Sequence, residues 1–374
     1  MNKGALNNTN NDTNPTTNDV NTFVGQNSDI LGVKKLFLDG VTPANKQITV
    51  LNKETLVTYA KNELAYSIGE SATSWVTQTS NFGTSVISTI AYGNNLWVAG
   101  GTGGTLRTST DAATWVTQTA NFGILGINSV AYGNGIWVAV GLSGTLRTST
   151  DAVTWVTQTS NFGATSISTV AYGNNLWVAG GNGGALRTST DAVTWVTQTS
   201  NFGTTTIQAV AYDNNLWVAG AAGGALRTST DAVTWVTQTS QFGATGINSV
   251  AYGNNLWVAV GAAGTLRTST DAVTWVTQTS NFGTSSISSV AYGSGIWVAV
   301  GLGGTLTAST DAVTWVTQTS QFGTSTIRSV AYGSGIWVAV GDGGTLRTLS
   351  ESSIDRTNYY TRAQSSNLTI GYAL

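Results

Sequence analysis

The chain has 374 residues, of which 9% are charged, and its 15 basic and 17 acidic residues leave a net charge of −2. It contains neither Cys nor His, which excludes a disulfide scaffold, a zinc site built from those ligands, and Ser-His-Asp or Cys-His nucleophiles. The balanced charge offers no basic stripe to nucleic acid or to an anionic membrane surface, so we expect neither partner.

The N-terminal arm, residues 1–30, contains nine Asn and almost no large apolar residues, and we expect it to be disordered. It has no apolar core of a signal peptide, and nowhere in the chain do 18 consecutive apolar residues occur. We therefore expect a product made in the cytoplasm without a membrane span.

Residues 31–70 have a different composition and predict a small α+β head. Residues 35–51 (KLFLDGVTPANKQITVL) favour a hairpin, and residues 52–67 favour a short helix capped by Asn52, with Leu56 and Leu64 on its apolar stripe. A head of this size cannot readily bury a core alone, so we expect it to pack on copies of itself, as a homo-oligomer, or on a larger assembly.

A repeat of 40 residues fills the chain from 71 to 350. One series of tryptophans marks each unit in the pattern SxxxW: Trp75, Trp115, Trp155, Trp195, Trp235, Trp275 and Trp315. A second series follows in the pattern (L/I)WVA: Trp97, Trp137, Trp177, Trp217, Trp257, Trp297 and Trp337. Residues 351–374 form a C-terminal tail after the last unit.

Each unit predicts four short strands. In the unit that begins at residue 111, runs rich in Val, Ile, Thr, Tyr and Trp cover 114–119, 127–132, 136–140 and 145–149, with Gly, Asn, Asp and Ser between them. The glycine content would disrupt the helix pairs of an α-solenoid of similar period. The sequence therefore predicts an all-β, seven-bladed propeller of four-stranded blades.

The ends of the repeat predict how the ring closes. Residues 71–80 supply an outer strand with no three strands before it, and residues 327–348 supply three inner strands with no outer strand after them. We expect the N-terminal strand to dock on the last blade, which pairs the open edge.

The turn STDAVTW, at residues 149–155 and in four later copies, with STDAATW at 109–115, resembles the Asp-box of sialidase-like and photosystem-assembly-type propellers. It is one residue shorter than the family pattern and has Ala where Gly is usual. The resemblance implies a structural turn between the third and fourth strands, with its Asp accepting backbone N–H bonds. The aspartates concerned are Asp111, Asp151, Asp191, Asp231, Asp271 and Asp311.

Sialidase activity does not follow from this resemblance. Sialidases hold the substrate carboxylate with three arginines at different strand positions, whereas here one position is copied: Arg107, Arg147, Arg187, Arg227, Arg267 and Arg347, with Thr307 in the sixth unit. Residues 71–350 contain no Glu for a pair of catalytic carboxylates. We expect no enzymatic activity, no catalytic residue, no cofactor and no metal.

Comparison between the units singles out one candidate binding face. Because neighbouring strands are antiparallel, the connections from strand four to one and from two to three leave on one face, and these differ between copies. The opposite turns (YGNN, YGNG, YGSG or YDNN, and STDA) are nearly uniform. The candidate residues are Thr84, Ser85, Ser88, Thr102, Leu125, Asn128, Leu142, Asn182, Thr205, Gln208, Asn248, Leu302, Arg328 and Asp342.

Two interpretations of that face stay open: a binding face for glycans or a protein surface, and drift of unconstrained loops after recent duplication. The repeated Phe of NFG and QFG, from Phe82 to Phe322, either stacks on sugars or plugs the gaps between blades.

The flanks carry a second resemblance. Residues 48–64 (ITVLNKETLVTYAKNEL) and the terminal DRTNYYTRAQSSNLTIGYAL are similar to stretches of bacteriophage tail fibres and virion appendages, whose recurrent YTKAQSD motif resembles residues 360–365 here. The resemblance implies attachment to other virion or tail proteins through residues 1–70 and 351–374.

The leading hypothesis is thus a non-enzymatic phage or phage-like virion protein, a tail fibre or baseplate appendage, whose head attaches to the particle and whose propeller adheres to a host surface. Such a protein is located in the virion. The alternative is a free bacterial lectin or protein-interaction scaffold in the cytoplasm or at the cell surface.

Overall fold

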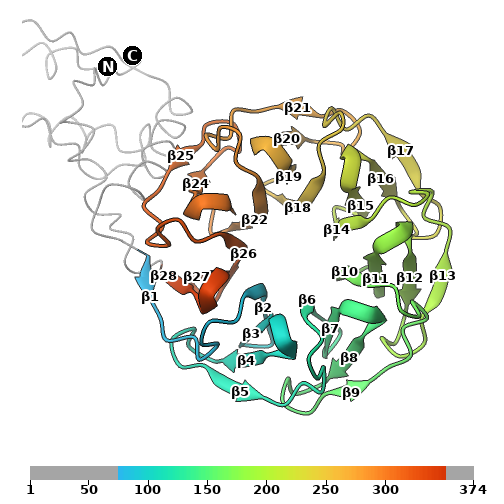
Figure 1. Ribbon diagram of the computed structural model, residues 1–374. Helices are drawn as coiled ribbons and strands as arrows, with labels where there is room; N and C mark the ends of the chain where they lie inside the picture. The colour runs from blue at the N-terminus through green and yellow to red at the C-terminus, as the bar shows by residue number, and fades with distance from the viewer. Residues whose placement is uncertain (1–74, 351–374) are drawn as a thin grey trace, which may run out of the picture. The chain divides into compact units, whose positions relative to one another are not determined.

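The computed structural model describes residues 75–350, which form seven four-stranded antiparallel sheets arranged as blades around one axis (Figure 1). The prediction of an all-β, seven-bladed propeller is confirmed. The predictions for residues 1–30, 31–70 and 351–374 lie outside the described residues.

The two inner strands of each blade are the longest. The innermost strands are Ile87–Gly93 (β2), Ile127–Gly133 (β6), Ile167–Gly173 (β10), Ile207–Asp213 (β14), Ile247–Gly253 (β18), Ile287–Gly293 (β22) and Ile327–Gly333 (β26). The second strands are Leu96–Gly101 (β3), Ile136–Gly141 (β7), Leu176–Gly181 (β11), Leu216–Ala221 (β15), Leu256–Gly261 (β19), Ile296–Gly301 (β23) and Ile336–Gly341 (β27).

The two outer strands are shorter. The third strands are Leu106–Ser109 (β4), Leu146–Ser149 (β8), Leu186–Ser189 (β12), Leu226–Ser229 (β16), Leu266–Ser269 (β20), Leu306–Ser309 (β24) and Leu346–Ser350 (β28). The outer strands are Val116–Gln118 (β5), Val156–Thr157 (β9), Val196–Gln198 (β13), Val236–Gln238 (β17), Val276–Thr277 (β21), Val316–Thr317 (β25) and Val76–Thr77 (β1). We number the blades from blade 1 (β2 to β5) to blade 6 (β22 to β25), and blade 7 contains β26, β27, β28 and β1.

Two kinds of turn join the inner strands to their neighbours. The turn from β2 to β3 has Asn94 and Asn95 at φ of 48° and 56°, the left-handed values that Asn and Gly tolerate in tight hairpins. From the second strand to the third, the chain makes a short 3-10 turn: Thr102–Gly104 (η1), Leu142–Gly144 (η2), Asn182–Gly184 (η3), Ala222–Gly224 (η4), Ala262–Gly264 (η5), Leu302–Gly304 (η6) and Asp342–Gly344 (η7).

The ring closes as the ends of the repeat predict. Strand β1 pairs antiparallel with β28, with Val76 opposite Thr348, and the Gln78 side-chain amide donates to the Thr348 hydroxyl at 2.8 Å. Strand β26 lies beside β2, so the last blade packs on the first. The chain therefore joins its first and last described strands in one sheet.

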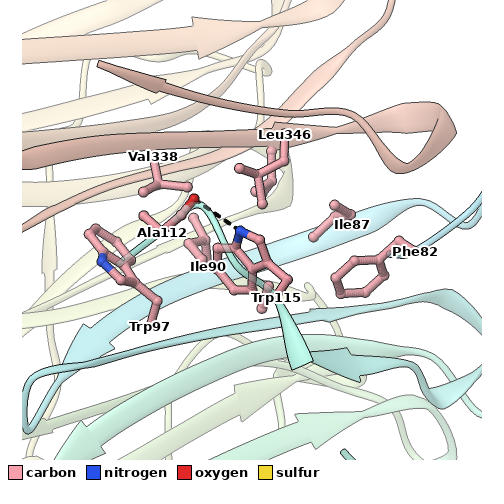
Figure 2. Close-up of a cluster of buried hydrophobic side chains, with 10 residues drawn as sticks. Phe82, Ile87, Ile90, Trp97, Ala112, Trp115, Val338 and Leu346 are labelled. Atoms are coloured by element: carbon pink, nitrogen blue, oxygen red, sulfur yellow. Dashed lines mark hydrogen bonds between the residues drawn. The ribbon is translucent and has the colours of Figure 1, made fainter. Parts of the chain in front are cut away.

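Hydrophobic clusters hold neighbouring blades together. Where blade 7 meets blade 1, Trp97, Trp115 and Phe82 pack against Val338 and Leu346, and the Trp115 indole donates to the Ala112 carbonyl at 3.0 Å (Figure 2). These aromatic side chains are at most 4% exposed. Equivalent clusters lie between blades 1 and 2, 2 and 3, 3 and 4, 4 and 5, and 5 and 6. Each large apolar side chain buried there contributes about 1.5–3 kcal/mol.

Side-chain hydroxyls link the innermost strands, which belong to separate sheets. The Val130 N–H donates to Thr89 Oγ1 at 3.3 Å, and serine hydroxyls accept the equivalent bonds from Val170, Val290 and Val330. Blade 4 has Ala209 at this position and offers no hydroxyl to Val250. The link between blades 4 and 5 is therefore missing.

The residue of the second strand that pairs with this Thr or Ser differs in size between blades. Thr89 faces Gly100, whereas Ser129 faces Val140. A Cβ on Gly100 would lie 2.7 Å from Ile127 Cγ2 and 3.2 Å from Thr89 Cγ2. Thr pairs with Gly in blades 1 and 3, and Ser, which lacks that methyl group, pairs with Val in blades 2, 5, 6 and 7.

Candidate functional site

The Asp turn between the third and fourth strands is a closed network of hydrogen bonds. In blade 1, the Asp111 carboxylate accepts from the backbone N–H groups of Ala113 (2.9 Å) and Thr114 (2.7 Å) and from the Ser109 hydroxyl (2.9 Å). The same pattern recurs at Asp151, Asp191, Asp231, Asp271 and Asp311.

These hydrogen bonds stabilise the ionised form of the carboxylate. Donation from the backbone of Thr114 and Ala113 lowers the pKa of Asp111 to about 2, and the equivalent donors lower the pKa of Asp151, Asp191 and Asp231 to about 2. Asp271 has its pKa lowered by the same cause. All of these carboxylates accept bonds within their own turn, as the Asp-box resemblance implies.

A connector leads from each outer strand to the innermost strand of the next blade. Side-chain hydrogen bonds join it to both of these blades. Ser80 donates to the carbonyl of Gly344 in η7 (2.6 Å), and the Asn81 side chain donates to the carbonyl of Trp115 in blade 1 (2.6 Å). Phe82 lies buried between the blades, with 4% of its surface exposed. Phe82 therefore fills the gap between two blades and presents no open ring face on which a sugar could stack.

An arginine on the third strand completes this fastening, and we call the arrangement the arginine latch. Arg107 Nη2 donates to the Asn81 carbonyl at 2.9 Å, and its guanidinium carbon lies 4.9 Å from the centroid of the Phe82 ring. The six latches have Nη2 to carbonyl distances of 2.7–3.0 Å and ring distances of 4.4–5.1 Å. Each arginine binds its own connector, so the six do not converge on one anion.

Partial burial lowers the pKa of these arginines from its usual value. A guanidinium nevertheless stays charged at neutral pH. The latch therefore combines a charge-assisted hydrogen bond with a cation–π contact.

The two variable connections lie side by side, and together we call them the varied face. In blade 1, the Thr102 N–H donates to the Val86 carbonyl at 3.0 Å, and the equivalent bond joins the 3-10 turn to the connector in every blade. Turns also touch the next connector, since a Cβ on Gly104 would lie 2.4 Å from the Gly123 carbonyl. The varied face consists of residues 83–86, 123–126, 163–166, 203–206, 243–246, 283–286 and 323–326 with turns η1 to η7.

The predicted face residues fall into two rings. An outer set lies in connectors and turns, and its exposed or half-buried members are Thr84, Ser85, Thr102, Leu125, Leu142, Asn182, Thr205, Leu302 and Asp342. An inner set occupies the second position of the innermost strands, where the register shifts by one residue: Ser88, Asn128, Gln208, Asn248 and Arg328.

Several inner residues already have partners within the ring. Asn128 donates to the Ile167 carbonyl of the next blade (2.9 Å), and Asn248 makes the equivalent bond to Ile287 (2.8 Å). Arg328 forms an ion pair with Asp342 at 2.7 Å. Gln208 differs, because its Oε1 is buried without a hydrogen-bond partner.

One apolar patch stands out on the varied face. Ile124 is 92% exposed and the next residue, Leu125, is half-buried. Leu142, which is 43% exposed, adjoins this connector, because its N–H donates to the Gly126 carbonyl at 3.1 Å. The other connectors carry Thr, Ser or Ala at the positions of Ile124 and Leu125. Exposed apolar side chains that are grouped together are more typical of interaction surfaces than single ones.

Within residues 75–350, no three acidic side chains gather closely enough to hold a metal ion. No helix in the same range is long and apolar enough to cross a bilayer.

The sequence matches no family model and no curated protein. Solved structures share the propeller. YCF48 from Cyanidioschyzon merolae aligns with a TM-score of 0.60 at 18% identity, covering 75% of this chain and 99% of that one. YCF48 bound to D1 peptide aligns with a TM-score of 0.62 at 16% identity, covering 74% and 95%. The computationally designed protein Ika8 aligns with a TM-score of 0.54 at 16% identity, covering 72% and 98%.

At these identities the likeness concerns the fold alone. The resemblance to photosystem-assembly-type propellers is thereby supported at the level of the scaffold: a seven-bladed ring similar to that of YCF48.

Proposed function

We propose that this chain is a non-enzymatic binding module whose varied face contacts a partner on a bacterial surface. The observation that carries the proposal is the hydrogen-bonded joining of the two variable connections in each blade, while the turns of the opposite face keep nearly one sequence. Differences between copies thus accumulate on one continuous surface.

The chemistry of that surface suits a neutral ligand. Its residues are mainly Thr, Ser, Gly and Ala, and its one charged side chain, Asp342, is paired with Arg328 of β26. The apolar patch of Ile124, Leu125 and Leu142 adds an anchoring point of the type that carries binding energy in protein interfaces. The ligand is a glycan or a protein segment exposed by the host.

We further propose that the protein is a phage or phage-like virion component, a tail fibre or baseplate appendage that is made in the host cytoplasm. The support is the resemblance of residues 48–64 and 360–365 to virion appendages. In this proposal residues 1–70 and 351–374 attach the propeller to the particle.

The alternative is a free bacterial lectin or interaction scaffold. It is favoured by one similar solved propeller, YCF48, that is bound to a peptide. The two candidates differ in the partner of the flanks and agree on the use of the propeller as a binding module.

The test is binding of labelled full-length protein to intact cells of candidate bacterial hosts. A varied-face variant carries Ile124→Thr, Leu125→Ser and Leu142→Asn, using residues found at the same positions in blades 1 and 3. A matched control carries Asn94→Ser and Asn95→Gly on the opposite face, as in blades 6 and 7. We expect the first variant to bind at least about fivefold more weakly, or about 1 kcal/mol, and the control to bind as the parent does.

Equal binding by both variants would overturn the proposal for this face. Competition by purified surface polysaccharide identifies a glycan ligand, and loss of binding after protease treatment of the cells identifies a protein ligand.

A further inference from the structure

The connector from blade 1 to blade 2 differs in chemistry from the other connectors of the ring. Residues 123–126 have the sequence GILG, whereas each of the other six connectors has at least one Thr or Ser in the same four positions. Neither these four residues nor turn η2 carries a charge. Within residues 75–350, this is therefore the connector that offers a ligand no polar side chain in those positions.

Leu142 of turn η2 extends this apolar surface. Its N–H donates to the Gly126 carbonyl at 3.1 Å, and a Cβ on Gly126 would lie 3.7 Å from Leu142 Cδ1. The leucine side chain thus lies beside the connector at a point where four of the other connectors have Ser or Thr. Ile124, Leu125 and Leu142 together make up the apolar patch.

The same connector lacks one of the usual attachments to its neighbour. In the other six connectors a Ser hydroxyl donates to a Gly carbonyl of a 3-10 turn, as Ser160 does to Gly144 at 2.7 Å. Ala120 occupies that position here and has no hydroxyl to donate. Fewer bonds to the rest of the ring make a local adjustment on binding less costly. Three departures from the repeat are therefore concentrated at the apolar patch.

The chemistry of the patch disfavours a sugar as its ligand. Sugar hydroxyls placed against it would lose water without gaining hydrogen bonds from side chains, which costs free energy. Phe122, the aromatic residue of this connector, is 3% exposed and so presents no ring face for stacking. An apolar protein surface meets neither obstacle.

The exposure of Ile124 indicates the shape of the partner. Its side chain is 92% exposed, so it stands clear of its own chain on almost all sides. A flat or thread-like ligand would cover one side of such a side chain, whereas a concave apolar pocket covers all of it. Side chains that fill pockets in this way supply much of the binding energy of protein interfaces.

The ring offers this arrangement once. Leu302 of turn η6 occupies the position of Leu142 and is 41% exposed, but its connector carries Thr284, Ser285 and Ser286. A single exposed leucine is ordinary on a protein surface. Blade 6 therefore provides an internal control, with the leucine of the turn but without the apolar connector.

We propose that the apolar patch binds an apolar pocket on a folded partner protein, at one site per propeller. Ile124 enters the pocket, and Leu125 and Leu142 pack against its rim. The inference rests on the proposed function for the location of the partner on a host surface. It narrows the ligand from a glycan or a protein to a protein.

The first test compares Ile124→Val with Ile124→Thr in the binding of labelled full-length protein to host cells to which the parent adheres. Val and Thr have nearly the same shape, and Thr has a hydroxyl in place of one methyl group. Loss of one buried methylene should weaken binding about fourfold in Ile124→Val. Ile124→Thr should bind at least about fivefold more weakly again, because the pocket gives its hydroxyl no partner.

The second test uses the two leucines of the turns as a matched pair. Leu142→Asn should weaken binding at least about fivefold, and Leu302→Asn should bind as the parent does. Thermal unfolding of each variant checks that the ring stays intact.

The third test moves the site to another blade. Thr284→Ile, Ser285→Leu and Ser286→Gly are introduced into the varied-face variant, where Leu302 completes the patch on blade 6. Binding should return to within about threefold of the parent. Protease treatment of the cells should abolish this binding, and periodate, which cleaves the vicinal diols of glycans, should leave it intact.

Equal binding by Ile124→Val and Ile124→Thr, or a folded graft that restores no binding, would overturn the inference. If the graft does not fold, the Val and Thr pair decides, since a side chain that is 92% exposed does not support the fold. Binding that periodate destroys and protease spares assigns a glycan to the varied face, which keeps the proposed function and removes the pocket. A varied-face variant that binds as the parent does would instead refute the proposed function itself.

Discussion

Asp213 occupies a position where six blades have Gly, and its replacement by Gly should stabilise the ring. A Cβ built on any of those six glycines would lie 2.2–2.5 Å from the Tyr side chain of the next blade. In blade 4 the equivalent position carries the Cβ of Asp213, and Tyr252 is the equivalent side chain of the next blade. The neighbouring ring must give way to it.

The aromatic pair of the next blade differs slightly from its equivalents. The rings of Tyr252 and Trp257 meet at 55°, against 49° to 52° for the equivalent pairs. The hydroxyl of Tyr212 donates to Asn215 at 3.4 Å, whereas Tyr252 makes no equivalent bond to Asn255 within the described residues. Both differences lie in the blade whose Tyr follows Asp213 instead of Gly.

The expected gain follows from three opposing contributions. Relief of overpacking stabilises by about 1–3 kcal/mol. The greater freedom of Gly in the unfolded chain costs about 0.4–1 kcal/mol, and loss of the bond from the Asn214 N–H to Asp213 Oδ1 costs about 0.5 kcal/mol. The net gain from Asp213→Gly is about 1 kcal/mol, or roughly 2–4 °C in Tm.

The assay is thermal and denaturant unfolding of the full chain with two matched controls. Asp213→Ala keeps the Cβ and should recover little stability, and Gly173→Asp introduces the same side chain against Tyr212 and should destabilise by about 1–3 kcal/mol. A neutral Asp213→Gly together with a tolerated Gly173→Asp would refute the packing argument.

Three further changes test the same account of the blades. Ala209→Ser supplies the hydroxyl that Val250 lacks, and chemical denaturation should show a gain of about 1 kcal/mol. Gly100→Val alone should cost about 1–3 kcal/mol, and adding Thr89→Ser should restore part of it, which a double-mutant cycle measures. Hydrogen bonding lowers the pKa of Asp111 to about 2, below the unfolded value of about 3.9, so its stabilisation is present above about pH 5 and is lost as the pH falls through about 2. Because Asp151, Asp191, Asp231 and Asp271 contribute in the same way, Asp111→Asn should reduce the slope in acid titrations of unfolding by one aspartate's share.

The sequence predicts the fold of this protein well because its signals are local and repeated. The 40-residue spacing of tryptophans, four β-rich runs per unit and the orphan outer strand at 71–80 together specify seven blades and their closure. Antiparallel strand order then places both variable connections on one face, which the bond from Thr102 to Val86 joins.

Contacts between repeats were harder to predict. The partner of Arg107 is a carbonyl 26 residues earlier, and only the path of the connector brings Asn81 and Phe82 beneath it. Likewise, the left-handed φ of 62° at Ala112 sits where the Asp-box family has Gly, and no local preference of Ala indicates it. The sequence shows that Thr307 replaces an arginine. Which contacts this replacement removes can be seen only from the structure, in which the other six arginines bind a carbonyl and a Phe ring.

The most direct measurement of the central claim is hydroxyl-radical footprinting of the full-length protein, free and bound to envelope preparations of a host to which it adheres. The account predicts protection of Ile124, Leu125 and Leu142 on the varied face, with Tyr92 and its equivalents on the opposite side unchanged. Protection confined to the tyrosines of the opposite face, with the varied face labelled as in the free protein, would contradict it.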